Sequence, residues 1–318
     1  MKAPILYVIT PCFNEEDVLP ETSKRLLNKI HTLIHDNKIS KDSLIVFIDD
    51  GSQDKTWDCI TELHKTNHEV AGIKLSRNRG HQNALLAGLD FARTRADVAI
   101  SLDADLQDDI NAMDEMLSDF ADGNDIVYGV RDSRSSDSSF KRLSALSFYK
   151  IMQLLGVDSV YNHADYRLTS RRVLEKLSDF HEVNLYLRGI FPLIGFKTAI
   201  VKYNRSERFA GKSKYPIKKM LSFAIDGITS FSVKPLRFIT SLGMIIFTAS
   251  IASAIYLLIE KVFGATEQGL TFIGISIWFI GGVQMLCIGV VGEYIGKIYS
   301  ETKSRPRFII ESILNEKK

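Results

Sequence analysis

Apolar and polar positions follow two different periods along the first two thirds of the chain. Short runs rich in Val, Ile and Leu alternate with longer segments in which apolar residues recur every three or four positions. The short runs predict buried strands, and the longer segments predict amphipathic helices that cover them. We predict strands at residues 5–10, 44–48, 70–75, 98–102 and 125–128 and helices at residues 15–35, 56–65 and 80–92, with a further helix before the last strand.

Strands separated by helices of this length predict an α/β fold built on a mostly parallel sheet with both faces covered. In such sheets ligands gather at the carboxyl ends of the strands. Three polar motifs directly follow predicted strands, at residues 11–15, 49–54 and 103–107. Their convergence at one edge of the sheet is the main indication of a functional site.

The last third of the chain has a different pattern. Residues 238–259 and residues 268–292 contain no charged side chain, and each stretch is long enough to cross the hydrocarbon core of a membrane. Two such stretches in tandem favour a transmembrane hairpin over a buried soluble helix. Lys and Arg concentrate outside the pair, with only Lys261 between them, so the positive-inside rule predicts that both ends of the chain are cytoplasmic.

We therefore divide the chain into a cytoplasmic α/β domain (1–215), an amphipathic juxtamembrane helix (216–235), two transmembrane helices (236–296, with spans at about 236–259 and 269–292) and a cytoplasmic tail (297–318). The juxtamembrane helix is predicted from a stripe of apolar residues before Pro235. Small residues in the two spans predict helix contacts between subunits, and hence a homo-oligomer: Ser250, Ala254, Gly292 and Gly296.

Composition narrows the possible classes. The 318 residues, 45% of them hydrophobic, suffice for one large core and a smaller part, and the net charge of +2 gives no indication of nucleic-acid binding. The three cysteines, Cys12, Cys59 and Cys287, lie too far apart to suggest a disulfide framework or a zinc site. The first residues carry no signal-peptide pattern, so we expect the N-terminal part to stay in the cytoplasm.

The motif Asp103-Ala104-Asp105-Leu106-Gln107 carries the clearest chemistry. Period-two alternation at the end of a strand puts the carboxylates of Asp103 and Asp105 on one face and turns Ala104 away. Two close carboxylates repel unless a cation lies between them, and Mg²⁺ or Mn²⁺ accepts two carboxylates while leaving positions for substrate phosphates. An isolated Asp-x-Asp also fits solvated turn residues, but the other motifs favour a metal site.

Two common nucleotide-binding motifs are absent. No G-x-G-x-x-G follows the first predicted strand, which argues against dinucleotide binding. Gly211-Lys212-Ser213 resembles the end of a P-loop, but the glycine that a P-loop needs at position 206 is a serine. We exclude a P-loop NTPase.

The ordered set of motifs resembles that of the family-2 glycosyltransferases, which have the GT-A (Rossmann-like) fold. These motifs are Pro11-Cys12-Phe13-Asn14-Glu15-Glu16, Asp49-Asp50-Gly51-Ser52-Gln53-Asp54, Arg77-Asn78-Arg79-Gly80 and Asp103-Ala104-Asp105-Leu106-Gln107. Two more resemble the polyprenyl-phosphate branch, which includes bactoprenol glucosyltransferase and dolichol-phosphate mannosyltransferase: Asp165-Tyr166-Arg167-Leu168 and Gly211-Lys212-Ser213-Lys214-Tyr215. The resemblance covers nearly the whole chain. It departs at Asp108-Asp109-Ile110, where the branch usually has a proline pair, and at Phe13, where tyrosine is common.

The resemblance implies a nucleotide-sugar site formed by Pro11, Phe13, Glu15, Asp49, Asp50, Arg77, Asp103 and Ala104. Phe13 can offer a ring and Glu15 an acceptor for ribose hydroxyls. Asp49 or Asp50 can accept from the imide N–H of uracil, while Gly51 lets the backbone come close. Asp50-Gly51 also fits an ordinary turn. Arg77 and Arg79 fit a surface loop as well as a diphosphate contact.

The reaction implied is an inverting displacement at the anomeric carbon of a nucleotide sugar by an oxygen of a lipid phosphate. Mg²⁺ or Mn²⁺ on Asp103, Asp105 and, by resemblance, Gln107 would neutralise the leaving diphosphate. The acceptor phosphate is already anionic near neutral pH, so it hardly needs a strong base. Asp165 matches the family position assigned as base or orienting carboxylate, and an ion pair with Arg167 is the structural alternative.

Two basic sets are candidates for binding the lipid phosphate. The serine-rich stretch 129–142 fits a solvated loop, but it also fits a basic loop that closes over a phosphate, and family position favours Arg131 and Arg142. The second set lies ahead of the membrane region: Arg208, Lys212, Ser213 and Lys214. We expect catalytic roles for Asp105, Asp165, Arg131 and Arg142.

The expected partners are a nucleotide sugar, undecaprenyl phosphate and membrane lipid at a bacterial inner membrane, in a pathway of cell-surface glycan or O-antigen modification. UDP-glucose is the preferred donor, with GDP-mannose and UDP-aminoarabinose derivatives as alternatives. A processive polysaccharide synthase would need a Gln-x-x-Arg-Trp motif, but neither Trp57 nor Trp278 follows an arginine. A non-catalytic membrane adaptor would be marked by loss of an acidic metal ligand, and none is missing.

Overall fold

The computed structural model describes residues 3–131, 163–183, 186–204, 232–262 and 270–315. These residues fall into two compact units. The first unit joins the described residues up to 204 with residues 304–315 from the C-terminal end, and the second contains residues 232–262 and 270–303. The C-terminal segment is thus part of the same unit as the N-terminal strands.

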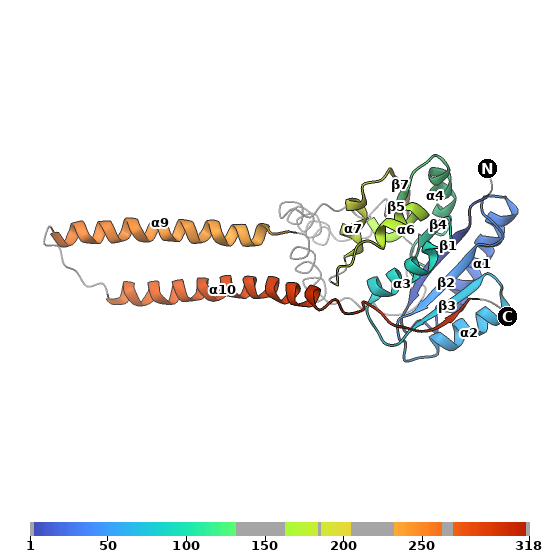
Figure 1. Cartoon of the computed structure of the whole chain (residues 1–318), viewed down its shortest axis with the longest axis horizontal. Helices are drawn as coiled ribbons and strands as arrows, with labels where there is room; N and C mark the ends of the chain where they lie inside the picture. The colour runs from blue at the N-terminus through green and yellow to red at the C-terminus, as the bar shows by residue number, and fades with distance from the viewer. Residues whose placement is uncertain (1–2, 132–162, 184–185, 205–231, 263–269, 316–318) are drawn as a thin grey trace. The chain divides into compact units, whose positions relative to one another are not determined.

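The first unit is built on an eight-stranded sheet with the strand order β7-β5-β6-β4-β1-β2-β3-β8 (Figure 1). β1 pairs in parallel with β2 and β4, β2 in parallel with β3, and β5 in parallel with β7. β6 and β8 are antiparallel to the strands that they pair with. The strands are β1 (Leu6–Cys12), β2 (Leu44–Asp49), β3 (Val70–Leu75), β4 (Val98–Ser101), β5 (Ile126–Arg131), β6 (His163–Ser170), β7 (Thr198–Tyr203) and β8 (Ile310–Leu314).

Helices cover both faces of this sheet because its strands carry apolar side chains on both sides. One core joins strand residues such as Val8 and Ile100 to α1 (Leu19–His35), α2 (Thr56–Thr66) and α4 (Ala112–Ala121). The helix α3 (His81–Arg93) lies on the opposite face. It packs so closely on the sheet that a Cβ added to Gly88 would lie 2.4 Å from Ile9 Cγ2 and 2.7 Å from Ile48 Cδ1. The helix α6 (Arg171–Leu177) contacts α3, and α7 (Leu187–Ile194) contacts α6.

The predicted α/β fold with a mostly parallel sheet is confirmed, and every strand and helix predicted before residue 131 is present. Their ends shift by a few residues. The helix predicted from residue 15 begins at Leu19, because residues 15–18 form a turn in which the N–H groups of Val18 and Leu19 donate to the Glu15 carbonyl at 3.1 and 2.9 Å. The first strand continues to Cys12, so the motif at residues 11–15 starts inside β1.

The strand β8 differs from the sequence expectation, which gave residues 297–318 only as a tail. It pairs with β3, with Leu314 opposite Gly72, and Lys74 Nζ lies 2.8 Å from Glu311 Oε1. It therefore covers the edge of β3, whose backbone groups would otherwise lack partners in the sheet. A five-residue edge strand has too short a pattern to stand out in the sequence.

The second unit consists of two long helices, α9 (Lys234–Val262) and α10 (Leu270–Thr302) (Figure 1). Within them, Lys234–Ser253 and Phe279–Thr302 are long and apolar enough to cross a membrane, and neither segment is buried inside the protein. The helices contact each other, and Tyr294 Oη donates to the Ser232 carbonyl at 2.6 Å. They correspond to the predicted spans at 236–259 and 269–292, but α10 continues to Thr302. Most of the predicted juxtamembrane helix (216–235) lies outside the described residues.

Candidate active site

The loops that follow β1 and β2 are joined by side-chain hydrogen bonds. The Asn14 N–H donates to Ser52 Oγ at 3.0 Å, and Asn14 Oδ1 accepts from the Gln53 N–H at 2.9 Å. The Glu15 N–H donates to Thr56 Oγ1 at 2.9 Å. The two motifs assigned to the nucleotide therefore form one surface, on which Phe13 and Glu15 are half-buried and Pro11 is buried.

The two aspartates at the end of β2 have different partners. Asp50 accepts the N–H groups of Arg79 at 2.7 Å and Gly80 at 2.9 Å, so it orders the loop that leads into α3. Asp49 Oδ1 accepts from the Ser52 N–H at 3.0 Å, whereas its buried Oδ2 has no hydrogen-bond partner among the described residues. Burial raises the pKa of both carboxyls, and these hydrogen bonds oppose the rise. Asp49 Oδ2 is thus the carboxylate oxygen of this pair that still needs a donor.

Gly51 was expected to let the backbone come close to the nucleotide, but it lies against the backbone of Arg77 and Asn78 instead. It has a φ of +67°, and a Cβ on it would lie 2.5 Å from Arg77 C and from Asn78 N. The glycine lets the chain pass against its own loop, and contact with a ligand is not what requires it. Arg77 itself is exposed.

The motif Asp103–Gln107, called the metal motif below because the sequence predicts a metal site there, follows β4. Asp103 and Asp105 are half-buried while Ala104 and Leu106 are buried, but the strand ends at Ser101 and residues 104–105 form a turn, so the expected continuation of the strand alternation is not what positions the two carboxylates. The Ala104 carbonyl accepts from Thr22 Oγ1 at 2.7 Å, and Asp105 Oδ1 accepts from the Gln107 N–H at 3.2 Å. Leu106 has a φ of 58°, which is uncommon for a residue other than glycine, and its side chain is buried.

The charges around this motif suit a divalent cation. Burial raises the pKa of Asp103; the neighbouring His81 opposes this rise, and the carboxylates of Asp165 and Asp105 add to it. Burial and the Asp103 carboxylate likewise raise the pKa of Asp108 to about 6. Among the described residues no three His, Cys, Asp or Glu side chains form a ready-made metal site. Two carboxylates, with further ligands from Gln107, water and substrate phosphates, match the way Mg²⁺ is usually bound.

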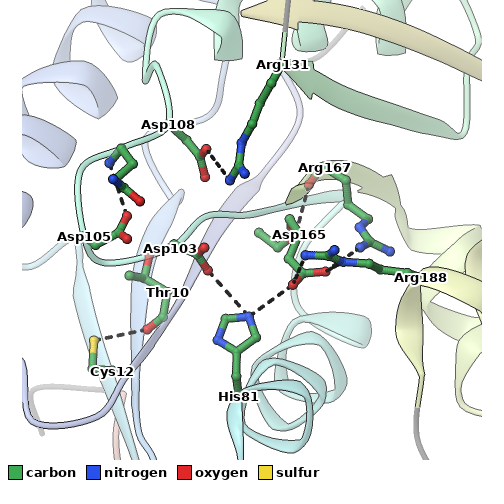
Figure 2. A network of polar contacts seen from close by, with 12 residues as sticks. Thr10, Cys12, His81, Asp103, Asp105, Asp108, Arg131, Asp165, Arg167 and Arg188 are labelled. Atoms are coloured by element: carbon green, nitrogen blue, oxygen red, sulfur yellow. Dashed lines mark hydrogen bonds and ion pairs between the residues drawn. The ribbon is translucent and has the colours of Figure 1, made fainter. Parts of the chain in front are cut away.

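Asp165, on β6, is surrounded by positive side chains (Figure 2). Arg188 binds it through two hydrogen bonds, Nε to Oδ1 at 3.0 Å and Nη2 to Oδ2 at 3.1 Å, and Arg167 Nη2 donates to Oδ1 at 3.1 Å. Burial alone would raise the pKa of Asp165, but Arg188 and His81 outweigh it and hold this pKa well below its usual value. A carboxylate held in this way is a weak proton acceptor. The ion pair with Arg167 that the sequence offered as an alternative is therefore present, with Arg188 added.

His81 connects the two acidic groups. Its Nε2 atom lies 3.5 Å from Asp103 Oδ1 and 3.5 Å from Asp165 Oδ2 (Figure 2). Burial would lower the pKa of His81, but the two carboxylates raise it to about 9. The imidazole places Asp165 one side chain away from the metal motif.

Arg131, at the end of β5, is held by a buried pair. Tyr203 Oη donates to Asp108 Oδ1 at 2.5 Å, Arg131 Nε donates to Tyr203 Oη at 3.4 Å, and Arg131 Nη2 lies 3.6 Å from Asp108 Oδ1. Of the residues assigned to the lipid phosphate, Arg131 is thereby brought beside the metal motif. The others lie outside the described residues: Arg142, Arg208, Lys212, Ser213 and Lys214.

Four residues that contact Asp103, Asp165 or Arg131 were not predicted from the sequence as functional candidates: His81, Asp108, Arg188 and Tyr203. His81 follows the Arg77-Asn78-Arg79-Gly80 motif and begins α3, and this position was its available signal. Asp108 was noticed only as a departure from a proline pair. No local pattern marks Arg188 or Tyr203, since both reach the cluster through the tertiary fold.

Comparison with known proteins identifies the family of the chain. Residues 7–178 match the sequence profile "Glycosyl transferase family 2", and residues 234–298 match "GtrB C-terminal hairpin". An "Uncharacterized glycosyltransferase YkoT" of Bacillus subtilis (strain 168) is 53% identical over 97% of this chain and 91% of that protein. A "Bactoprenol glucosyl transferase" of Shigella phage SfX is 39% identical over 96% of this chain and 98% of that protein.

A third relative is a "Prophage bactoprenol glucosyl transferase homolog" of Escherichia coli (strain K12), 37% identical over 96% of this chain and 98% of that protein. The matches span both the sheet unit and the helical unit. The motifs at residues 11–15, 49–54 and 103–107 lie at the carboxyl ends of β1, β2 and β4, the edge at which ligands bind in open α/β sheets. The chain therefore belongs to glycosyl transferase family 2, with a GT-A fold followed by a GtrB C-terminal hairpin.

Proposed function

We propose that this glycosyltransferase transfers glucose from UDP-glucose to undecaprenyl phosphate, with inversion at the anomeric carbon. The observation that carries the proposal is the gathering of Asp103 and Asp105, Arg131 and the Asp165–Arg188 pair around one point at the strand ends (Figure 2). Relatives named bactoprenol glucosyl transferase support this donor and this lipid. GDP-mannose and UDP-aminoarabinose derivatives remain the alternative donors.

The donor diphosphate fits the carboxyl ends of β1, β2 and β4. Asp49 Oδ2 offers a buried acceptor that suits an imide N–H, and the half-buried Phe13 and Glu15 lie on the adjoining loop. Mg²⁺ or Mn²⁺ held by Asp103, Asp105 and Gln107 would act as a Lewis acid on the leaving diphosphate. The loop that Asp50 holds presents Arg77 at the same edge.

The acceptor phosphate needs cations more than it needs a base, because a phosphate monoester is already anionic. Arg131 is held toward the site by Asp108 and Tyr203, and its planar fork matches two phosphate oxygens. Asp165 serves to orient its neighbours, because its low pKa makes it a poor base. Arg142 and the basic set at residues 208–214 are proposed to complete the phosphate site.

We also propose that the protein is a multi-pass protein of a bacterial inner membrane with its sheet unit in the cytoplasm, where it supplies a lipid-linked sugar for cell-surface glycans such as O-antigen. The two apolar helices and the hairpin match support this placement. A homo-oligomer is consistent with Gly292 and Gly296, since a Cβ on either would meet nothing within 4 Å.

The test of this function is a donor panel. Membranes containing the protein are incubated with undecaprenyl phosphate and labelled UDP-glucose, GDP-mannose or UDP-aminoarabinose, and the organic phase is analysed for lipid-linked sugar. We expect label from UDP-glucose in the lipid product. Label only from another donor would replace the sugar in this proposal, and no product from any donor would contradict the function.

A further inference from the structure

Arg188 is anchored at the junction of two helix starts. It is the second residue of α7, and the preceding Leu187 N–H donates to the side chain of Gln82 at 2.8 Å. Gln82 belongs to the first turn of α3, next to His81. The start of α7 is thereby fixed to the helix end that borders the metal motif.

The two arginines on Asp165 have different surroundings. The Arg167 side chain is 1% exposed, and its guanidinium carbon lies 4.1 Å from the centre of the Phe191 ring. The Arg188 side chain is 38% exposed. Arg188 is therefore the arginine of the two that solvent or a substrate can reach.

Arg188 lies near the metal motif, close enough for its charge to oppose the rise in the pKa of Asp103 that burial causes. His81 Nε2 is 3.5 Å from oxygens of both Asp103 and Asp165, so a single imidazole separates the carboxylate that holds Arg188 from the one that begins the metal motif (Figure 2). The two hydrogen bonds to Asp165 hold the Arg188 guanidinium in one plane and orientation. The fork geometry matches phosphate oxygens.

We propose that Arg188 is a phosphate-binding residue of the reaction centre and that Asp165 is the positioning residue that holds its guanidinium. Phosphate oxygens occur in both the donor diphosphate and the acceptor monoester. The proposal rests on the proposed function for the identity of these two substrates. Its chemistry, a fixed arginine for a phosphate beside a metal motif, is the same for either source.

The test compares Arg188→Gln and Arg188→Lys with wild type in steady-state assays, each substrate being varied at saturation of the other. Arg172→Gln is the matched control, because Arg172 is an exposed arginine whose Nη1 lies 3.6 Å from a carboxylate oxygen of Asp125. We expect Arg188→Gln to raise the KM for one substrate by about tenfold or more, and Arg188→Lys to recover part of that loss. The control should match wild type.

The substrate whose KM rises identifies the source of the phosphate: UDP-glucose for the diphosphate, undecaprenyl phosphate for the monoester. Added guanidinium should restore turnover to Arg188→Ala and should not stimulate wild type. A purely structural role for the arginine would not give this rescue. Both KM values unchanged in Arg188→Gln and Arg188→Lys, or a loss that neither lysine nor guanidinium relieves, would overturn the assignment.

A failure of the proposed function gives a different result. In that case wild type itself makes no lipid-linked sugar from UDP-glucose, and binding of inorganic pyrophosphate and inorganic phosphate is measured by calorimetry in the presence of Mg²⁺. Weaker binding of either anion by Arg188→Lys or Arg188→Gln than by wild type and Arg172→Gln supports the phosphate role. Equal binding by all four proteins refutes it.

Discussion

The phenol of Tyr203 donates to Asp108 Oδ1 at 2.5 Å, and Arg131 contacts both residues. Asp108 is 5% exposed and Tyr203 is 3% exposed, so this pair forms a buried support beneath an arginine that is more accessible. β5 supplies the arginine and β7 the tyrosine, and these strands lie side by side in the sheet. The support is thus fixed by strand pairing.

The first prediction follows from this support. Arg131→Ala should raise the KM for undecaprenyl phosphate, because it removes a charge-assisted hydrogen bond that contributes on the order of 1.5–3 kcal/mol to binding. The KM for UDP-glucose should change little. Tyr203→Phe keeps the ring but removes the hydroxyl, so it should give a smaller rise for the same substrate. Lys197→Ala, a surface lysine bonded to the Asp122 carbonyl, is the control. Unchanged lipid kinetics in Arg131→Ala would remove this arginine from the acceptor site.

The second prediction concerns the role of Asp165. If it acts through Arg188, the double variant Asp165→Asn/Arg188→Gln should be no slower than Arg188→Gln alone, because the two residues work as one unit. A general base would make its own contribution, and removing it would cost a further 10²–10⁴-fold, roughly, in the double variant. Steady-state kcat values of the four proteins in the cycle give the answer, and additive losses would restore Asp165 as the base.

The third prediction concerns Gly51. An alanine there would place its Cβ 2.5 Å from the backbone of Arg77 and Asn78, so the loop held by Asp50 must move. Gly51→Ala should therefore weaken UDP binding, measured by calorimetry, and lower the melting temperature. Gly123→Ala is the matched control, with a φ of +84° and nothing within 4 Å of the added Cβ. It should cost only about 1 kcal/mol of stability for the strained backbone and leave UDP binding intact. Equal UDP affinity in both variants would separate this loop from the donor site.

The sequence predicted the positions of the motifs at the ends of β1, β2 and β4 because each motif follows directly on the apolar run of its own strand. The apolar run before Asp103 predicts the strand β4, and the structure confirms it, but the strand ends at Ser101 and the motif itself continues in a turn. The same holds for the motif after β2, although the roles of its two aspartates differ. Asp50 binds the chain's own backbone, whereas Asp49 Oδ2 has no hydrogen-bond partner in the part of the chain that the structure describes.

Other parts of the site depend on long-range packing that no local pattern records. Arg188 meets a carboxylate 23 residues away, and Tyr203 meets one 95 residues away. β6 pairs antiparallel with both β4 and β5, and this pairing carries Asp165 to the metal motif. The strand β8 pairs with β3 across an even longer separation, as its Lys74–Glu311 contact shows.

The fourth prediction is topological. If α9 and α10 form a membrane hairpin, a reporter fused within residues 265–268 should behave as periplasmic, and reporters at either terminus should behave as cytoplasmic. Alkaline phosphatase and green fluorescent protein fusions report the two sides. A cytoplasmic signal from the 265–268 fusion would contradict the hairpin, whatever the enzyme assays show.

The fifth prediction concerns the metal motif. Asp105→Asn removes one charged ligand, and the leaving diphosphate gains negative charge as its bond to the sugar breaks, so the loss should be larger in the transition state than in the ground state. We therefore expect a heavy fall in kcat and a smaller change in UDP-glucose affinity. Asp109→Asn is the control, since it removes a charge from the same loop while its side chain can still accept from the Asn111 N–H. EDTA should abolish wild-type turnover, and Mg²⁺ or Mn²⁺ should restore it far better than Ca²⁺, whose larger and looser coordination shell fits a two-carboxylate site poorly. Full turnover in EDTA, or an Asp105→Asn protein as fast as the Asp109→Asn control, would refute metal-assisted transfer at this site.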